Sequence, residues 1–234
     1  LNPNTDAKTL SQISTGKKEN KFGVNQKIFL QLVSYLKDSK YLNLKCLSVH
    51  IGSQILNHKP YENMLKVINK IISKSNHKFE YIDLGGGMGI DYEHNNSKLN
   101  LKKYSKNIQK FLKKNNSKII FEPGRSIVGN SAVLITRILY IKEGYKKDFV
   151  ILDAAMNDLM RPALYGAKHR IIPSKKTKKV TKKSYEFVGP ICESTDTFSI
   201  VKKYQKLDEK DFLVICDVGA YGTSLASNYN VRPK

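Results

Sequence analysis

The sequence predicts an α/β protein in which the C-terminal half of a parallel (β/α)8 barrel is followed by a mostly antiparallel β-domain. Two observations support this fold class. Helical and short strand patterns alternate in the first part of the chain, and strand patterns dominate after Arg125. The 234 residues are 40% hydrophobic, enough for two modest domains. We place them at residues 1–128 and 129–234, with the chain returning to the barrel after about residue 219.

Three helices are expected in the first domain, because apolar residues recur there at helical spacing. They cover residues 24–36, the segment after Pro60, and about residues 101–114. Short apolar runs between the helices, bounded by Gly or Pro, have the length of buried parallel strands. These runs are residues 44–51, 79–84 and 118–121. We interpret Leu1–Pro3 as the end of one more strand, which gives half of an eight-stranded barrel.

The second domain is expected to consist mainly of β-strands. Four apolar segments have strand-like patterns with little helix between them, which is typical of an antiparallel domain. They are residues 132–141, 148–153, 185–191 and 212–218. The basic segment Lys175–Lys183 is interpreted as a solvated loop or hairpin tip.

The composition excludes several classes of partner. The net charge of +21 suggests nucleic acid, but only five of the 41 basic residues are arginines, and the lysines are scattered over every expected surface. We therefore expect no specific nucleic-acid binding. No apolar run is long enough to span a membrane, and the start lacks a secretion pattern. The three cysteines suggest neither disulfides nor a zinc site, so we expect a cytoplasmic protein without a metal.

Residues with useful chemistry lie where three expected strands end. His50 lies near the end of the first, Gly85–Gly87 follow the second, and Glu122–Arg125 follow the third. In a parallel barrel these strand ends meet on the C-terminal face, where such enzymes keep their active sites. Consecutive glycines let backbone N–H groups approach a phosphate, and Arg125 or the Ser53 hydroxyl could add contacts. A carboxylate such as Glu122 can hold a pyridine nitrogen protonated, and an imidazole such as His50 can stack on the ring.

The motifs also resemble a known family. They are similar to those of the fold-type III, alanine-racemase-like enzymes that use pyridoxal 5′-phosphate, and most closely to the diaminopimelate decarboxylases within them. The resemblance covers nearly the whole chain, and its motifs occur in the family's order. They are Ile13–Gly16, Glu19–Gly23, His50–Gln54, Asp83–Gly87, Glu122–Arg125, Met156–Pro162 with Tyr165, Cys192–Ser194 and Gly219–Gly222.

The resemblance implies a role for each cofactor-binding residue. His50 would stack on the cofactor ring, and Glu122 would pair with the ring nitrogen. Further positions implied for cofactor binding, mostly around the phosphate, are Ser53, Gly86, Gly87, Pro123, Gly124, Arg125 and Tyr221.

The implied activity is decarboxylation of meso-2,6-diaminopimelate to L-lysine and CO₂, the last step of lysine biosynthesis. Cys192 would be the catalytic proton donor, and the segment Cys192–Glu193 would reach the site of a second subunit in a homodimer. The implied substrate-binding residues are Arg125, Arg161, Tyr165, Glu193 and Tyr221. From the residues alone, Tyr165 could instead pack in a core and Arg161 could form a surface ion pair.

Other readings stay open at this point. A related ornithine, arginine or carboxy-polyamine decarboxylase would use the same fold, and a non-catalytic homologue could regulate an active partner. The resembled family binds its cofactor covalently through a lysine in an Ala-x-Lys-Ala-like context on the first barrel strand, and no lysine here has that context. We therefore expect that lysine to lie upstream of Leu1 and the present chain to be inactive by itself.

Overall fold

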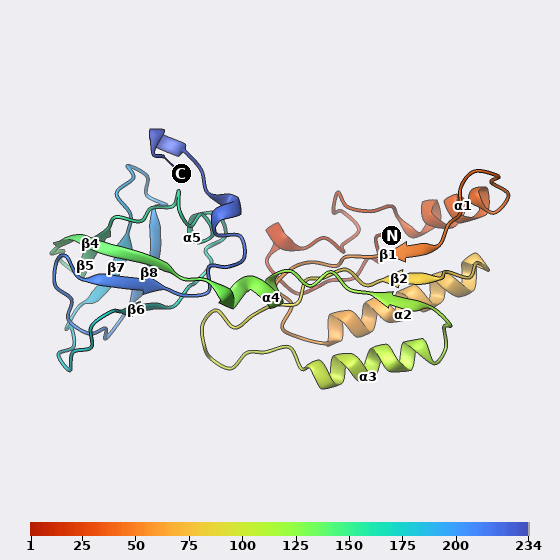
Figure 1. Cartoon of the computed structure of the whole chain (residues 1–234), viewed down its shortest axis with the longest axis horizontal. Helices are drawn as coiled ribbons and strands as arrows, with labels where there is room; N and C mark the ends of the chain where they lie inside the picture. The colour runs from red at the N-terminus through yellow and green to blue at the C-terminus, as the bar shows by residue number, and fades with distance from the viewer. Residues whose placement is uncertain (234) are drawn as a thin grey trace. The chain divides into compact units, whose positions relative to one another are not determined.

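The first part of the chain forms a parallel sheet covered by helices. The computed structural model describes residues 1–233. Strands β1 (Cys46–Ser48), β2 (Tyr81–Asp83) and β3 (Lys118–Ile120) pair in parallel in the order β1-β2-β3, as Figure 1 shows. The helices α1 (Gln26–Leu36), α2 (Lys59–Ser75) and α3 (Leu101–Leu112) alternate with them. The predicted succession of parallel β/α units is confirmed.

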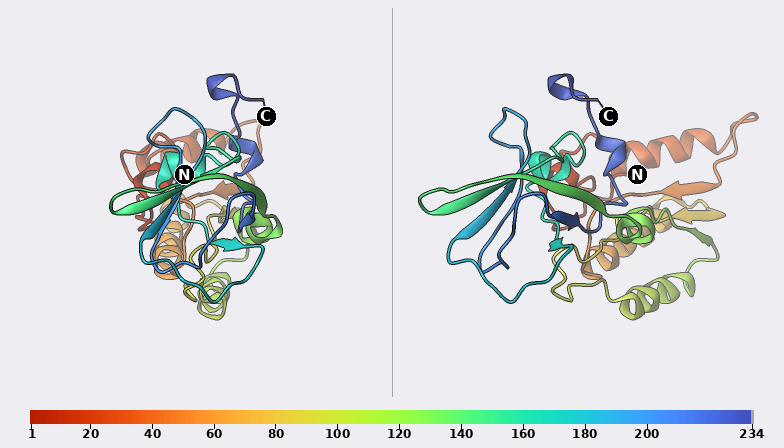
Figure 2. Two further views of the ribbon diagram at one scale, coloured as in Figure 1. Left: turned by 90° about the vertical axis from the view of Figure 1, so that its left-hand side faces the viewer. Right: turned by 60° about the vertical axis from the view of Figure 1, so that its left-hand side comes forward.

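The helix boundaries follow from local side-chain chemistry. The Asn25 side chain accepts a hydrogen bond from the Ile28 N–H before α1, and Asn100 accepts one from Lys103 before α3. Helix α2 has Pro60 in its first turn and ends at Asn76 in the left-handed conformation. Neighbouring helices pack against each other in the order α1, α2, α3, which can be followed in Figure 2.

The core of this part lies between the helices and the strands. One face of α2 buries Tyr61, Met64, Ile68 and Ile71, at the spacing expected of an amphipathic helix. They join a cluster with strand residues such as Ile82, which is fully buried. The apolar spacing in the sequence therefore places the helices against the sheet.

Leu1–Pro3 is not a strand. The Asn2 N–H donates to the Val24 carbonyl at 2.8 Å, and the amino group of Leu1 donates to the Ser48 carbonyl at 2.8 Å. These bonds hold the segment as an irregular stretch beside β1. The described residues thus contain three barrel strands rather than four.

The second part of the chain forms a six-stranded mixed sheet. Its strands follow the spatial order β6-β9-β4-β5-β7-β8, and every pair is antiparallel except β5 with β7. This confirms the prediction of a mostly antiparallel domain. The strands are β4 (Leu134–Lys142), β5 (Lys147–Leu152), β6 (Ile171–Pro173), β7 (Ser184–Val188), β8 (Thr197–Val201) and β9 (Phe212–Ile215).

Several short elements lie outside the predicted ones. The helices are α4 (Arg125–Val128) and α5 (Arg161–Tyr165), and β6 and β8 are the additional strands. Short 3₁₀ turns occupy Ser11–Ile13, Gly129–Ser131, Thr223–Leu225 and Tyr229–Val231. No helix among residues 1–233 is long and apolar enough to cross a membrane.

The chain divides into two compact units with separate apolar clusters. The first unit comprises Leu1–Ile90 and Asn96–Ser126, and the second comprises Asp91–Asn95 and Ile127–Lys234. The second cluster contains Ile138, Phe187 and Leu213, and it shares no residue with the first. The boundary after residue 128 and the return to the barrel after about residue 219 stay predictions.

Candidate active site

The three segments that follow the strands of the first unit are joined by backbone hydrogen bonds. The Val49 N–H donates to the Asp83 carbonyl at 2.9 Å, and the Glu122 N–H donates to the Gly85 carbonyl at 3.0 Å. The parallel arrangement therefore continues past the strand ends. It brings His50, Gly85–Gly87 and Glu122 to one edge, as their places in the sequence predicted.

A hydrogen bond fixes the state of the His50 ring. The Gly86 N–H points at His50 Nδ1 at 3.3 Å, and because a backbone N–H can only donate, Nδ1 is the acceptor. The proton of the neutral ring then lies on Nε2. His50 is exposed, as is Glu122. Both side chains are thus accessible to a bound molecule.

Two of the glycines are required by close packing and by backbone conformation. A Cβ atom at Gly86 would lie 2.1 Å from the Glu122 carbonyl oxygen. Gly87 has φ +85°, and a Cβ there would lie 2.1 Å from the Gly52 carbonyl oxygen. The triple glycine therefore lets the second strand end sit against both neighbours, and any larger residue would push them apart.

Asp83 organises this edge although it was not among the predicted site residues. One carboxylate oxygen accepts from the Ser48 hydroxyl at 2.9 Å, and the other accepts from the Gly85 N–H at 2.9 Å. The side chain is buried. It therefore joins β1 to the turn that opens the glycine run.

Ser53 and Arg125 form a donor pair suited to an anion. Arg125 Nη2 donates to the Ser53 hydroxyl at 3.1 Å, and Arg125 is buried at the start of α4. A Cβ built at Gly124 meets no heavy atom within 4 Å, so space is open beside the pair. A guanidinium, a hydroxyl and glycine backbone are the groups that proteins use for phosphate. The residues present fit a phosphate-bearing cofactor with a pyridine ring.

In the second unit, Arg161 is buried among aromatic and imidazole rings. Arg161 Nη1 lies 2.6 Å from His169 Nε2, and its guanidinium carbon lies 4.2 Å from the centroid of the Tyr92 ring. Arg161 opens α5, and Tyr165 is half-buried at the end of that helix. Tyr92 and His169 were missed in the sequence, because no local pattern marks a contact between segments so far apart.

Cys192 and Glu193 lie exposed in a tight loop after β7. Asp196 closes this loop, since its carboxylate accepts from the Ile191 N–H at 2.8 Å and from the Met156 N–H at 2.6 Å. Burial raises the pKa of the Asp196 carboxyl, and the two backbone hydrogen bonds oppose that rise. Asp196 was also missed by the sequence reasoning.

Tyr221 has the left-handed conformation, with φ +58°, and its side chain is exposed. It follows Gly219, at which a Cβ would lie 1.8 Å from the Val128 carbonyl oxygen. Its place in a site stays a prediction.

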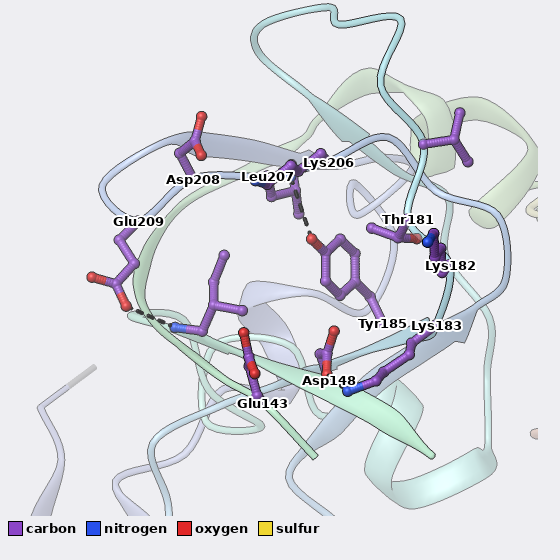
Figure 3. Close-up of a pocket in the computed structure, with 12 residues that line it drawn as sticks. Glu143, Asp148, Thr181, Lys182, Lys183, Tyr185, Lys206, Leu207, Asp208 and Glu209 are labelled. Atoms are coloured by element: carbon purple, nitrogen blue, oxygen red, sulfur yellow. Dashed lines mark hydrogen bonds and ion pairs between the residues drawn. The ribbon is translucent and has the colours of Figure 1, made fainter. Parts of the chain in front are cut away.

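A pocket of about 510 Å³ at one end of the second unit's sheet contains none of the predicted site residues (Figure 3). Several of its polar groups are used internally. Tyr185 accepts a hydrogen bond from the Leu207 N–H at 3.4 Å, Glu209 accepts one from the Ile141 N–H at 3.1 Å, and Lys183 pairs with Asp148 at 3.3 Å. We assign no function to this pocket. Within residues 1–233, no group of three His, Cys, Asp or Glu residues could hold a metal ion.

Comparison with known proteins identifies the family. A model described as "Pyridoxal-dependent decarboxylase, pyridoxal binding domain" matches residues 1–129, which is more than half of the chain. The chain belongs to the pyridoxal-dependent decarboxylases. The match includes each of the strand-end segments that carry His50, Gly85–Gly87 and Glu122.

Two similar members of this family are named diaminopimelate decarboxylase. A diaminopimelate decarboxylase from Helicobacter pylori is 43% identical over the whole chain, and one from Neisseria meningitidis is 42% identical over 99% of it. The chain spans 58% and 56% of their lengths. The crystal structure of the Helicobacter pylori enzyme complexed with L-lysine matches with a TM-score of 0.91 at 43% identity, over 100% of this chain and 59% of that one.

Proposed function

We propose that the full-length protein decarboxylates meso-diaminopimelate to L-lysine and CO₂ with pyridoxal 5′-phosphate as cofactor. The observation that carries this proposal is the similarity of the whole chain to a diaminopimelate decarboxylase that was crystallised with L-lysine. The donor groups at the strand ends of the first unit support the choice of cofactor.

The first unit supplies the residues that would hold the cofactor. Ser53, Arg125 and the backbone of the glycine run would bind the phosphate, and the exposed His50 ring would lie on the face of the pyridine. The Glu122 carboxylate would accept a hydrogen bond from the protonated pyridine nitrogen. When bound, the cofactor withdraws the electron pair left as the bond to the departing carboxylate breaks.

The second unit supplies residues suited to the substrate. The guanidinium of Arg161 matches the planar carboxylate at the distal end, and Glu193 can pair with the distal ammonium. Further candidates for substrate contacts are Tyr165 and Tyr221 of the second unit and Arg125 of the first. The Cys192 thiol would donate a proton to the carbon that lost the carboxylate.

A homodimer in the cytoplasm is part of the same proposal. Cys192 and Glu193 are both exposed, so neither is committed to the interior of its own unit. Exposed residues such as these can contribute side chains to the active site of a second subunit. Alanine at either position should then be complemented by mixing with a variant that carries Glu122→Ala, because a mixed dimer would restore one complete site.

The proposal is tested on the full-length protein supplied with pyridoxal 5′-phosphate. We expect an absorbance band at about 420 nm, typical of the protein-bound cofactor. We also expect release of lysine and CO₂ from meso-diaminopimelate. Release from ornithine or arginine, with none from diaminopimelate, would overturn the substrate assignment. Failure to bind the cofactor would instead favour a regulatory homologue.

A further inference from the structure

We propose that His169 and Tyr92 are positioning residues that orient the guanidinium of Arg161 toward the distal carboxylate of the substrate. The inference rests on the proposed function, in which Arg161 binds that carboxylate. It concerns two residues that no motif in the sequence singled out.

The His169 ring is held in one tautomer by its two partners. A guanidinium stays protonated in proteins, so Arg161 Nη1 donates to His169 Nε2 across the 2.6 Å that separates them. The ring proton therefore lies on Nδ1, which donates to the Cys216 carbonyl oxygen at 2.8 Å. This chain of hydrogen bonds ties Arg161 on α5 to the backbone just after β9.

Tyr92 restrains the guanidinium from another direction. The guanidinium carbon lies 4.2 Å from the centroid of the Tyr92 ring, a distance typical of a cation–π contact. The Tyr92 ring also meets the His169 ring edge to face, with centroids 5.0 Å apart and an angle of 67°. The three side chains thus form one packed group.

The chemical character of His169 and Tyr92 fits a role in positioning the guanidinium. His169 restrains the guanidinium through a hydrogen bond and Tyr92 through a cation–π contact, so the two restraints act on different parts of the group. All three side chains are buried, and buried rings permit few rotamers. A guanidinium fixed before the substrate arrives loses less conformational entropy on binding, which raises affinity.

The orientation of Arg161 should affect the affinity for any ligand that retains the distal end of the substrate. Loss of CO₂ from one end of diaminopimelate leaves the amino acid at the other end intact in L-lysine. Binding of L-lysine to the full-length protein, measured by calorimetry, therefore reports on Arg161 without any turnover.

The decisive comparison uses two replacements of His169. His169→Gln keeps an acceptor within reach of Arg161, whereas His169→Leu removes it. We expect His169→Leu to raise the KM for diaminopimelate and the Kd for L-lysine about tenfold, the effect of about 1.4 kcal/mol, with kcat changed less than about twofold. His169→Gln should keep both the KM for diaminopimelate and the Kd for L-lysine near their wild-type values. Tyr92→Leu should weaken binding several-fold, and Tyr92→Phe should not.

The control is His77→Leu, which removes a 2.8 Å contact between another imidazole and a carbonyl, that of Leu44, in the first unit. Unchanged KM and Kd in His169→Leu would overturn the inference and leave the proposed function intact. An equal loss of kcat and thermal stability in both His169 variants would also overturn it, because that result indicates a structural role. A wild-type protein that fails to turn over diaminopimelate would overturn the proposed function itself.

Discussion

At the scale of single residues, the site depends on short contacts that leave no room for larger side chains. Gly86 and Gly124 both lie at the edge that we propose binds the cofactor, but their surroundings differ. A Cβ at Gly86 would collide with the Glu122 carbonyl oxygen, whereas one at Gly124 would meet nothing within 4 Å. Replacing glycine by alanine should therefore affect stability differently at these two positions.

Gly86→Ala should lower the free energy of unfolding by about 1–3 kcal/mol, the range for overpacking a close contact. The backbone of Glu122 would have to move, and backbone atoms relax less easily than side chains. Gly124→Ala is the matched control and should change the free energy by less than about 0.5 kcal/mol. Urea unfolding of the purified variants measures both, and equal losses would contradict the argument.

Asp196→Asn should also destabilise the protein, because one amide oxygen cannot accept from both Ile191 and Met156. We expect a loss of about 1–3 kcal/mol in unfolding free energy. Burial raises the pKa of Asp196 in the folded state above its ordinary 3.8, so the folded protein binds this proton more tightly than the unfolded chain does. The contribution of the ionisable group to stability is thus complete below 3.8 and decreases as pH rises through the raised pKa.

The pH dependence of Asp196→Asn is checked by urea unfolding across that window. The difference between wild type and variant should narrow as the pH rises from about 4 toward neutrality. Asp38→Asn, at an exposed carboxylate, is the control and should show no such trend. A difference that widens with pH would show that the two hydrogen bonds outweigh the effect of burial.

At the scale of elements, the periodic segments were predictable and the short ones were not. Helices α1 to α3 follow from apolar spacing, and the parallel strands follow from Gly- and Pro-bounded apolar runs. Strand β6 is three residues long and ends in Pro173, and β8 is a short strand at the edge of the sheet that pairs with β7. The segment Leu1–Pro3 was wrongly interpreted as a strand, because its short pattern did not reveal its bonds to the carbonyls of Val24 and Ser48.

Asn25→Ala should remove the side-chain cap of α1 and cost about 1 kcal/mol of unfolding free energy. Asn25→Asp keeps an oxygen that can accept from the Ile28 N–H, so it should retain most of that stability. Hydrogen exchange at the Ile28 amide gives a local readout, with faster exchange in the alanine variant alone. Similar exchange in both variants would argue against a role for the cap.

At the scale of the whole molecule, the two units have separate cores, and the sequence predicted both kinds of sheet. The shared edge of His50, Gly85–Gly87 and Glu122 could be predicted, because parallel strands bring their ends together. Tyr92, His169 and Asp196 could not, because their roles depend on contacts between segments that only the folded chain brings into reach. Periodicity in a sequence indicates which face of a helix or strand is buried. It does not indicate which distant residue a side chain will contact.

The separation of the cores predicts additive effects. Ile82→Val and Ile215→Val lie in different clusters, so their costs of about 0.5–1.5 kcal/mol each should add within about 0.5 kcal/mol. Ile82→Val with Ile119→Val is the contrasting pair, because these residues are register partners in adjacent strands. Thermal or urea unfolding of the single and double variants measures the coupling, which should be larger for the adjacent pair.

The position of β9 in the second sheet affects the order in which the protein can be made. This strand pairs with β4 and β6 although it follows every other strand within residues 1–233. During synthesis on the ribosome, β4 therefore emerges long before one of its two neighbours exists. Its edge stays open until Phe212–Ile215 has been translated, and exposed strand edges are prone to pair with other chains. During this interval the nascent protein therefore exposes a strand edge that can pair with other chains.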